Sequence, residues 1–281
     1  TYGSSYVAWN WKAGGAAVTI AANTVGNTIA SDVSANVDAG FSIVSYTGSG
    51  SAATVGHGLD SVPEMLIIKG RTIDVGGNGS DWVVWNKDLT SANYSLELNT
   101  TDAQASVPTR FGTLPTSSVF SVGGSAFTSA ATGYIAYAFH SVDGFSKIGS
   151  YTGTNGVGTN TIVTGFRPAF VMIKRTDSTG NWRMYDDARN PGDTPKEISA
   201  NLAANSSGSE YNDPSPGNGY FFFSSTGFYF PSGYGNADIN GTGDYIFMAF
   251  AEEGLPYVTR NATNPFGDSS ELALYKFEDD A

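Results

Sequence analysis

The chain contains two copies of one sequence pattern, and this duplication constrains its fold more than any other feature. "GFSIVSYTG" begins at Gly40 and recurs downstream as "GFSKIGSYTG". Further on, "VPEMLIIK" ends at Lys69 and "RPAFVMIK" ends at Lys174, 105 positions later. Because self-similarity at a fixed spacing is the signature of a repeated structural unit, we expect two copies of one β unit, over residues 40–139 and 140–254.

The local pattern within each copy predicts strands. Short runs such as "SIVSYTG" and "EMLIIK" are rich in β-branched and aromatic residues and end at glycine, proline or charge. "NGYFFFSSTGFYFPSG" predicts a hairpin in which Phe221 to Phe223 and Phe228 to Phe230 flank a short loop. Residues 194–205 are the best candidate for a helix. We therefore predict an all-β fold of two tandem, internally duplicated β-sandwich-like units with antiparallel sheets.

The regions outside the two copies carry further strand patterns. "YVAWNW", which starts at Tyr6, has the same pattern as the closing segments "YIAYAF" and "YIFMAF" of the copies. A lone strand exposes unpaired backbone groups, so we expect it to complete a unit by pairing with a sheet of this chain or of a neighbour. The rest of residues 1–39 is predicted to be a Gly/Ala/Ser-rich linker. Residues 255–281 are expected to be an acidic tail or a linker to a further domain.

Charge and composition argue against several classes of partner and cofactor. The chain has 26 acidic and 14 basic residues and a formal charge of −12, so a nucleic acid is not an expected partner. No apolar run reaches the ~18 residues of a membrane helix, so membrane insertion is not expected either. The chain has no cysteine, which excludes disulfides and thiolate-based zinc or iron–sulfur sites.

The residues that could support catalysis form no clear constellation. Only two histidines occur, His57 and His140, and we expect both to be structural. A glycosidase needs two facing carboxylates, and Asp186, Asp187 and Glu197 are candidates, but their spacing selects no pair. A polysaccharide-degrading enzyme therefore requires two acids that meet across one groove. We predict no catalytic residue and no enzymatic activity.

No cofactor is expected, and calcium is the one candidate that the residues offer. "NADINGTGD" places Asp238, Asn240 and Asp244 on a glycine-rich loop after Asn236. Oxygen ligands at alternate positions followed by glycine suit calcium, so these three residues are candidate ligands. The alternative is an Asn-Gly turn that leads into the strand "YIFMAF".

Aromatic residues in loops are candidates for sugar binding. Tyr211 lies in "GSEYNDPSPGNG" and Tyr234 lies in "PSGYGNAD", and neither has an apolar run beside it. Exposed rings of this kind can stack on a sugar. Aromatic residues that recur at matched positions, such as Trp82 and Trp182, are instead expected in the core.

The repeated segments resemble an uncharacterised β-rich domain of tail-fibre and other virion-associated proteins of marine bacteriophages. The resemblance rests on "YVAWNWKAGG" (6–15), "GFSIVSYTGSGSAATVGHGL" (40–59), "GYIAYAFHSVDGFSKIGSYTG" (133–153), "GFRPAFVMIKRTDSTGNW" (165–182) and "YIFMAFAE" (245–252). "LALYKFEDDA" resembles the first strand of a laminin-G or concanavalin-like jelly roll. Relatives often have a cysteine where this chain has "AYAF" and "FMAF".

This resemblance implies a structural role with no known catalytic residue. It implies a non-enzymatic component of a phage virion, such as a tail fibre or other surface appendage, located on the virion or outside the cell. Expected partners are copies of the chain itself, as a trimer, together with other virion proteins and a host-surface glycan. The alternative is an extracellular carbohydrate-binding module that uses loop aromatics with calcium assistance.

Overall fold

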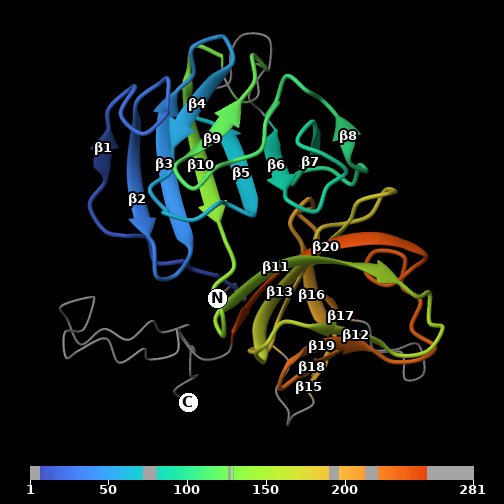
Figure 1. The fold of residues 1–281 in the computed structure, drawn as a ribbon. Helices are drawn as coiled ribbons and strands as arrows, with labels where there is room; N and C mark the ends of the chain where they lie inside the picture. Colours follow the sequence, from blue (N-terminus) through green and yellow to red (C-terminus); the bar gives the residue numbers. More distant parts are fainter. Residues whose placement is uncertain are drawn as a thin grey trace, which may run out of the picture.

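The computed structural model of the chain describes residues 7–71, 81–125, 128, 130–189, 196–212 and 221–251. The regular structure in these ranges consists of strands, and strands that pair within each sheet run antiparallel. They build two tandem, internally duplicated β-sandwich-like units, which confirms the predicted fold class (Figure 1). A helix able to span a bilayer does not occur in this part of the chain.

The first unit contains strands β1 to β10. Their bounds are β1 (Val18–Ile20), β2 (Ser31–Asn36), β3 (Phe41–Thr47), β4 (Ala53–Gly56), β5 (Met65–Gly70), β6 (Trp82–Asn86), β7 (Tyr94–Glu97), β8 (Ala105–Ser106), β9 (Val119–Val122) and β10 (Gly133–Phe139). The large sheet has the order β1-β2-β3-β10-β5-β6-β7-β8, and β4 pairs with β9 in a small sheet.

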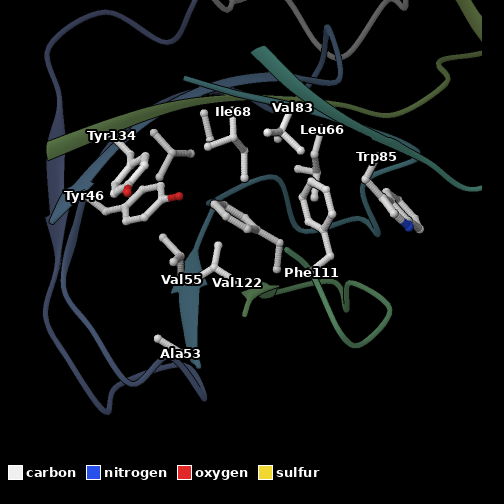
Figure 2. Close-up of a cluster of buried hydrophobic side chains, with 14 of the residues drawn as sticks. Tyr46, Ala53, Val55, Leu66, Ile68, Val83, Trp85, Phe111, Val122 and Tyr134 are labelled. Carbon is white, nitrogen blue, oxygen red and sulfur yellow. The ribbon is translucent and has the colours of Figure 1, made fainter. Parts of the chain in front are cut away.

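The core of the first unit lies between these two sheets. Figure 2 shows Val55 and Val122 of the small sheet facing Ile68 and its neighbours on the large sheet. Successive side chains of a strand point to opposite faces, so β10 directs Tyr134 inward to this core and Tyr137 to the other side. Both faces of the large sheet therefore carry apolar side chains, which explains the continuous apolar runs in the sequence.

The second unit contains strands β11 to β20. Their bounds are β11 (Ser146–Gly153), β12 (Asn160–Val163), β13 (Pro168–Arg175), β14 (Arg183–Asp186), β15 (Lys196–Ile198), β16 (Ala200–Ala203), β17 (Tyr211–Asn212), β18 (Phe221–Ser224), β19 (Gly227–Phe230) and β20 (Gly243–Ala251). One sheet has the order β11-β20-β13-β14-β16-β17, and the other has the order β12-β19-β18-β15. The predicted phenylalanine hairpin is confirmed as β18 and β19.

The duplication extends to strand order and to individual ring contacts. The order β3-β10-β5-β6-β7-β8 in the first unit is matched by β11-β20-β13-β14-β16-β17 in the second. Tyr46 and Tyr134 stack with ring centroids 5.3 Å apart, and Tyr151 and Tyr245 stack at 5.1 Å. Burial raises the pKa of both Tyr46 and Tyr151, so these rings stay neutral inside their units.

Two segments differ from their predicted structure. The helix candidate at 194–205 forms β15 and β16, because Ile198 and Ala200 are buried and the strands find partners in β18 and β14. The predicted linker contains β1 and β2, and β2 pairs with β3 with Val33 opposite Val44. In β2, small residues alternate with polar ones. The composition of β2 is therefore typical of a loop, but the alternation of its side chains fits a strand.

Residues 7–11 of "YVAWNW" pair with no described strand of their own chain, and pairing with a neighbouring chain stays a prediction. They lie outside any strand, although alternate side chains are turned toward the protein. Side chains of β2 hold the segment that follows, since Asn36 Nδ2 donates to Lys12 O at 3.2 Å and Ser34 Oγ donates to Gly15 O at 2.7 Å. Trp9 and Trp11 pack into an apolar core that both units share.

This shared core lies between the large sheets of the two units. It combines first-unit residues such as Phe41 and Ile67 with second-unit residues such as Met172 and Phe250. The second unit has a core of its own between its two sheets, rich in phenylalanine from β18 and β19. The units are therefore fused through an apolar interface rather than tethered side by side.

Candidate functional site at the junction of the two repeats

Three aromatic residues meet at one end of the junction. The ring of Trp11 lies 6.3 Å from Phe139 and 5.5 Å from Phe250, and Phe139 lies 6.3 Å from Phe250. Each of the three is the last residue of one of the similar segments "YVAWNW", "YIAYAF" and "YIFMAF". Edge-to-face contacts of this kind stabilise the protein by about 0.5–1.5 kcal/mol each, beyond the contribution of burying the rings. The N-terminal segment therefore stabilises the contact between the units.

Trp9 extends the same contact to a charged pair. Its ring lies 5.4 Å from Phe170, and its Nε1 donates to Asp186 Oδ2 at 3.1 Å. The guanidinium of Arg189 lies 5.5 Å from the Trp9 ring and donates from Nε to the same Asp186 oxygen at 2.7 Å. The carboxylate of Asp186 is buried, and it is neutralised by this arginine.

The other end of the junction is held by hydrogen bonds to one turn of the first unit. Trp182, which is 1% exposed, donates from Nε1 to Glu97 O at 2.9 Å. Lys174, which has no exposed surface, donates from Nζ to Thr101 O at 3.2 Å and to Arg175 O at 2.8 Å. The turn of residues 97–102 therefore covers a tryptophan and a lysine of the second unit.

The turn is fixed further by backbone hydrogen bonds to the second unit. Gly180 N donates to Thr101 O at 2.9 Å, and Gln104 N donates to Thr176 O at 2.9 Å. Burial lowers the pKa of Lys174 to about 8, with smaller opposing effects from Asp238 and Asp102. The cost of removing the hydration of Lys174 is partly offset by the two carbonyl oxygens that accept from Nζ and by the nearby carboxylates.

The candidate calcium ligands are each engaged within the protein. The Asp238 carboxylate accepts hydrogen bonds from Asn181 and from Arg183, whose Nη2 is 2.7 Å away. Burial opposes ionisation of Asp238, but these hydrogen bonds outweigh it and lower the pKa of the carboxyl. Asn240 Oδ1 accepts from Thr154 N and Asn160 Nδ2, and Asp244 Oδ1 accepts from the hydroxyl of Thr152 at 3.0 Å, as hydrogen-bond partners of the neighbouring strands.

The loop is therefore built as a network of protein contacts. Asn240 N donates to Asn236 O at 2.7 Å, which closes a turn before β20. Among the described residues, no group of three or more histidine, aspartate or glutamate side chains is arranged to hold a metal ion. Calcium would have to compete with the donors that the side-chain oxygens of Asp238 and Asn240 already have.

The two candidate sugar-binding tyrosines lie in different environments. Tyr234 is only 5% exposed and stacks on Phe230 at 5.8 Å in the core of the second unit, so its expected exposure is wrong. The loop turns back so that Tyr234 packs on Phe230 at the end of the preceding strand β19 and joins the core of the second unit. Tyr211 is 52% exposed, and Arg183 lies 5.8 Å from its ring.

The titratable residues weighed for catalysis have different partners or lie in different sheets. Asp186 is paired with Arg189, and Asp187 lies 3.5 Å from Arg167. Glu197 is on β15, in the other sheet of the same unit. His57 is buried, with Nε2 3.1 Å from Thr116 O and Nδ1 accepting from Leu59 N at 3.2 Å.

Sequence reasoning missed the residues that hold the junction. Trp9 and Trp11 belong to "YVAWNW", whose pattern matches the closing strands of the two copies. Their packing role could not be predicted, because it depends on a surface formed by both units. Lys174 was visible only as the match of Lys69. The residue types in the turn at 97–102 do not indicate that it forms an interface.

The fold and this junction define a class of all-β proteins built from two fused repeats. The chain belongs to the family described as a domain of unknown function (DUF7483), whose model matches residues 1–254. No curated protein and no solved structure matches the chain significantly.

Proposed function

We propose that this protein is a non-enzymatic structural and adhesive component of a bacteriophage virion, in a tail fibre or another surface appendage. The observation that carries this proposal is the apolar core shared by the two units. Units joined only by a linker move independently, whereas a large apolar interface fixes their orientation. A fixed tandem unit suits a part that bears mechanical load.

Two further observations support the proposal. The repeated segments resemble domains of phage tail-fibre and virion-associated proteins. The carboxylates weighed for catalysis, Asp186 and Asp187, each have an arginine partner and so have a structural use. On this proposal the protein acts on the virion or outside the cell, with other virion proteins as neighbours and with loops directed toward a host surface.

Self-association, as a trimer, is part of the proposal. Sedimentation equilibrium of the full chain at micromolar concentration is expected to give three times the monomer mass. A stable monomer under these conditions would contradict assembly as the basis of the function. Fluorescently labelled chain is also expected to bind intact host cells, and absence of binding across a panel of marine bacteria would remove the adhesive part.

A second candidate function is an extracellular carbohydrate-binding module. The exposed ring of Tyr211 favours it, because an exposed aromatic ring can stack on a sugar. Calcium at Asp238, Asn240 and Asp244 belongs to this candidate. The buried Tyr234 does not take part.

A glycan array followed by calorimetry tests the second candidate. Tyr211→Ala is expected to weaken binding at least tenfold, which corresponds to about 1.4 kcal/mol. Tyr229→Ala is the matched control, because Tyr229 is a partly exposed tyrosine on the β18–β19 hairpin. Equal binding by both variants, or no glycan bound at all, would exclude this candidate.

A further inference from the structure

The turn that holds the junction is present twice in the chain. Residues 97–102 of the first unit and residues 203–208 of the second form turns with the same five hydrogen bonds. In the first unit these are Leu98 N to Trp82 O (2.9 Å), Trp82 N to Asn99 Oδ1 (2.8 Å), Asn99 Nδ2 to Asp81 Oδ1 (2.9 Å), Thr100 N to Glu97 O (3.3 Å) and Asp102 N to Thr100 Oγ1 (3.3 Å). In the second they are Ala204 N to Trp182 O (3.0 Å), Trp182 N to Asn205 Oδ1 (2.8 Å), Asn205 Nδ2 to Asn181 Oδ1 (2.9 Å), Ser206 N to Ala203 O (3.1 Å) and Gly208 N to Ser206 Oγ (3.0 Å).

The surface that receives the first turn is also present twice. In the second unit it consists of Lys174 and Trp182, both buried under residues 97–102. In the first unit the matched residues are Lys69 and Trp82. Lys69 Nζ lies 5.8 Å from the Trp82 ring, and Tyr137 stacks on that ring with centroids 6.4 Å apart.

The two surfaces differ in what covers them. Trp82 and Lys69 are partly exposed, whereas Trp182 and Lys174 are buried. The indole N–H of Trp182 donates to Glu97 O, but that of Trp82 has no acceptor within the described part of the chain. The second turn is exposed as well, from Ser206 to Ser209. The first matched pair is therefore joined by the Trp182–Glu97 hydrogen bond, whereas within the described residues Trp82 Nε1 makes no such bond to the turn at 203–208.

We propose that the Trp82–Lys69 surface of one copy of this chain binds the turn at 203–208 of a second copy. By analogy with the junction, Trp82 Nε1 donates to Ala203 O and Lys69 Nζ donates to Ser207 O. The occupant is a second copy because this turn already matches, bond for bond, the one that binds the equivalent surface. The inference rests on the self-association included in the proposed function.

Such a contact is head-to-tail, since each copy offers a different surface at each end. A contact of this type closes into a ring if its rotation allows, and otherwise extends into a filament. Trp82 is partly exposed, and its indole N–H can donate a hydrogen bond. Tryptophan residues at an interface often contribute much of its binding free energy. The proposed contact would bury Trp82 as Trp182 is buried now.

Site-directed cross-linking tests the contact, because the chain has no cysteine of its own. Arg71→Cys with Ser209→Cys places one thiol beside each proposed partner and leaves Trp82 and Lys69 intact. Ala103→Cys with Thr176→Cys places thiols at the matching positions of the existing junction. Under mild oxidation, which needs no reagent to reach the buried position 176, the second pair is expected to form a disulfide within a chain and the first pair a disulfide between chains.

Sedimentation of Trp82→Ala and Lys69→Glu completes the test. Either substitution is expected to weaken association at least tenfold and to abolish the intermolecular cross-link, while the unfolding curve of Lys69→Glu stays close to wild type. If both variants still form oligomers and the intermolecular cross-link is absent, this inference is overturned. The proposed role in assembly is not affected by that result. A wild-type chain that stays monomeric would overturn both.

Discussion

Lys174 Nζ donates a hydrogen bond to the main-chain oxygen of Thr101 at 3.2 Å, so a buried cation of the second repeat is bound to a turn of the first. The matching Lys69 remains partly exposed over Trp82. The same residue type at the same repeat position therefore has two environments, and the difference comes from the turn that covers one of them.

The burial of Lys174 predicts a rise of stability with pH. Burial lowers its pKa from 10.5 to about 8, so between these values the unfolded chain keeps the proton that the folded chain has released. The free energy of unfolding should then increase by up to about 1.4 kcal/mol per pH unit above pH 8. Urea denaturation between pH 7 and about 9 measures this slope, because most tyrosines of the unfolded chain are still neutral in that range.

Lys174→Met is expected to remove this slope while changing stability at pH 7 by no more than about 1–2 kcal/mol, because an apolar side chain can replace a buried charge at little cost. Lys69→Met is the matched control and should retain the slope. An unchanged slope in Lys174→Met would show that the pH dependence arises elsewhere.

Trp11 is expected to stabilise the junction through its contacts with Phe139, Phe170 and Phe250. Trp11→Ala should lower the free energy of unfolding by about 2–3 kcal/mol, less than the 3–5 kcal/mol typical of a fully buried aromatic residue. Urea unfolding followed by tryptophan fluorescence and circular dichroism measures the loss. Val157→Ala, at a side chain that is 80% exposed, should change stability by less than about 0.5 kcal/mol.

The burial of His57 predicts that the free energy of unfolding decreases in mild acid. Burial lowers its pKa below 6.5, and protonation of Nδ1 would break the hydrogen bond that Nδ1 accepts from Leu59 N. The unfolded chain therefore binds this proton first, and stability should fall by up to about 1.4 kcal/mol per pH unit as pH drops below about 6.5. Thermal unfolding between pH 7 and 5 checks this, and His57→Gln should show a smaller slope than wild type.

Asp238 is expected to act as a structural anion. Its carboxylate accepts hydrogen bonds from Arg183 and Asn181, so Asp238→Asn should lower stability by about 1–3 kcal/mol. We expect the melting temperature of the wild type to be the same in calcium and in EDTA. A rise in calcium that disappears in Asp238→Asn would instead show that a metal ion replaces these donors.

The sequence alone determined the class of fold and its duplication. Runs such as "EMLIIK" and the phenylalanines of 221–230 are short, rich in β-branched or aromatic residues and bounded by turn residues, which favours a sheet. The spacing of Lys69 and Lys174 reported the repeat directly. These signals are local or periodic, so they survive without knowledge of neighbours.

Only the tertiary structure decided which repeated residues are buried, exposed or paired across the units. Tyr234 lies in a glycine-rich loop yet is buried, and residues 196–203 became strands because β18 and β14 offered partners. The burial of Trp182 and the exposure of Trp82 follow from a turn of the other unit. Contacts between residues far apart in the chain carry no local pattern, because they depend on how two finished sheets meet.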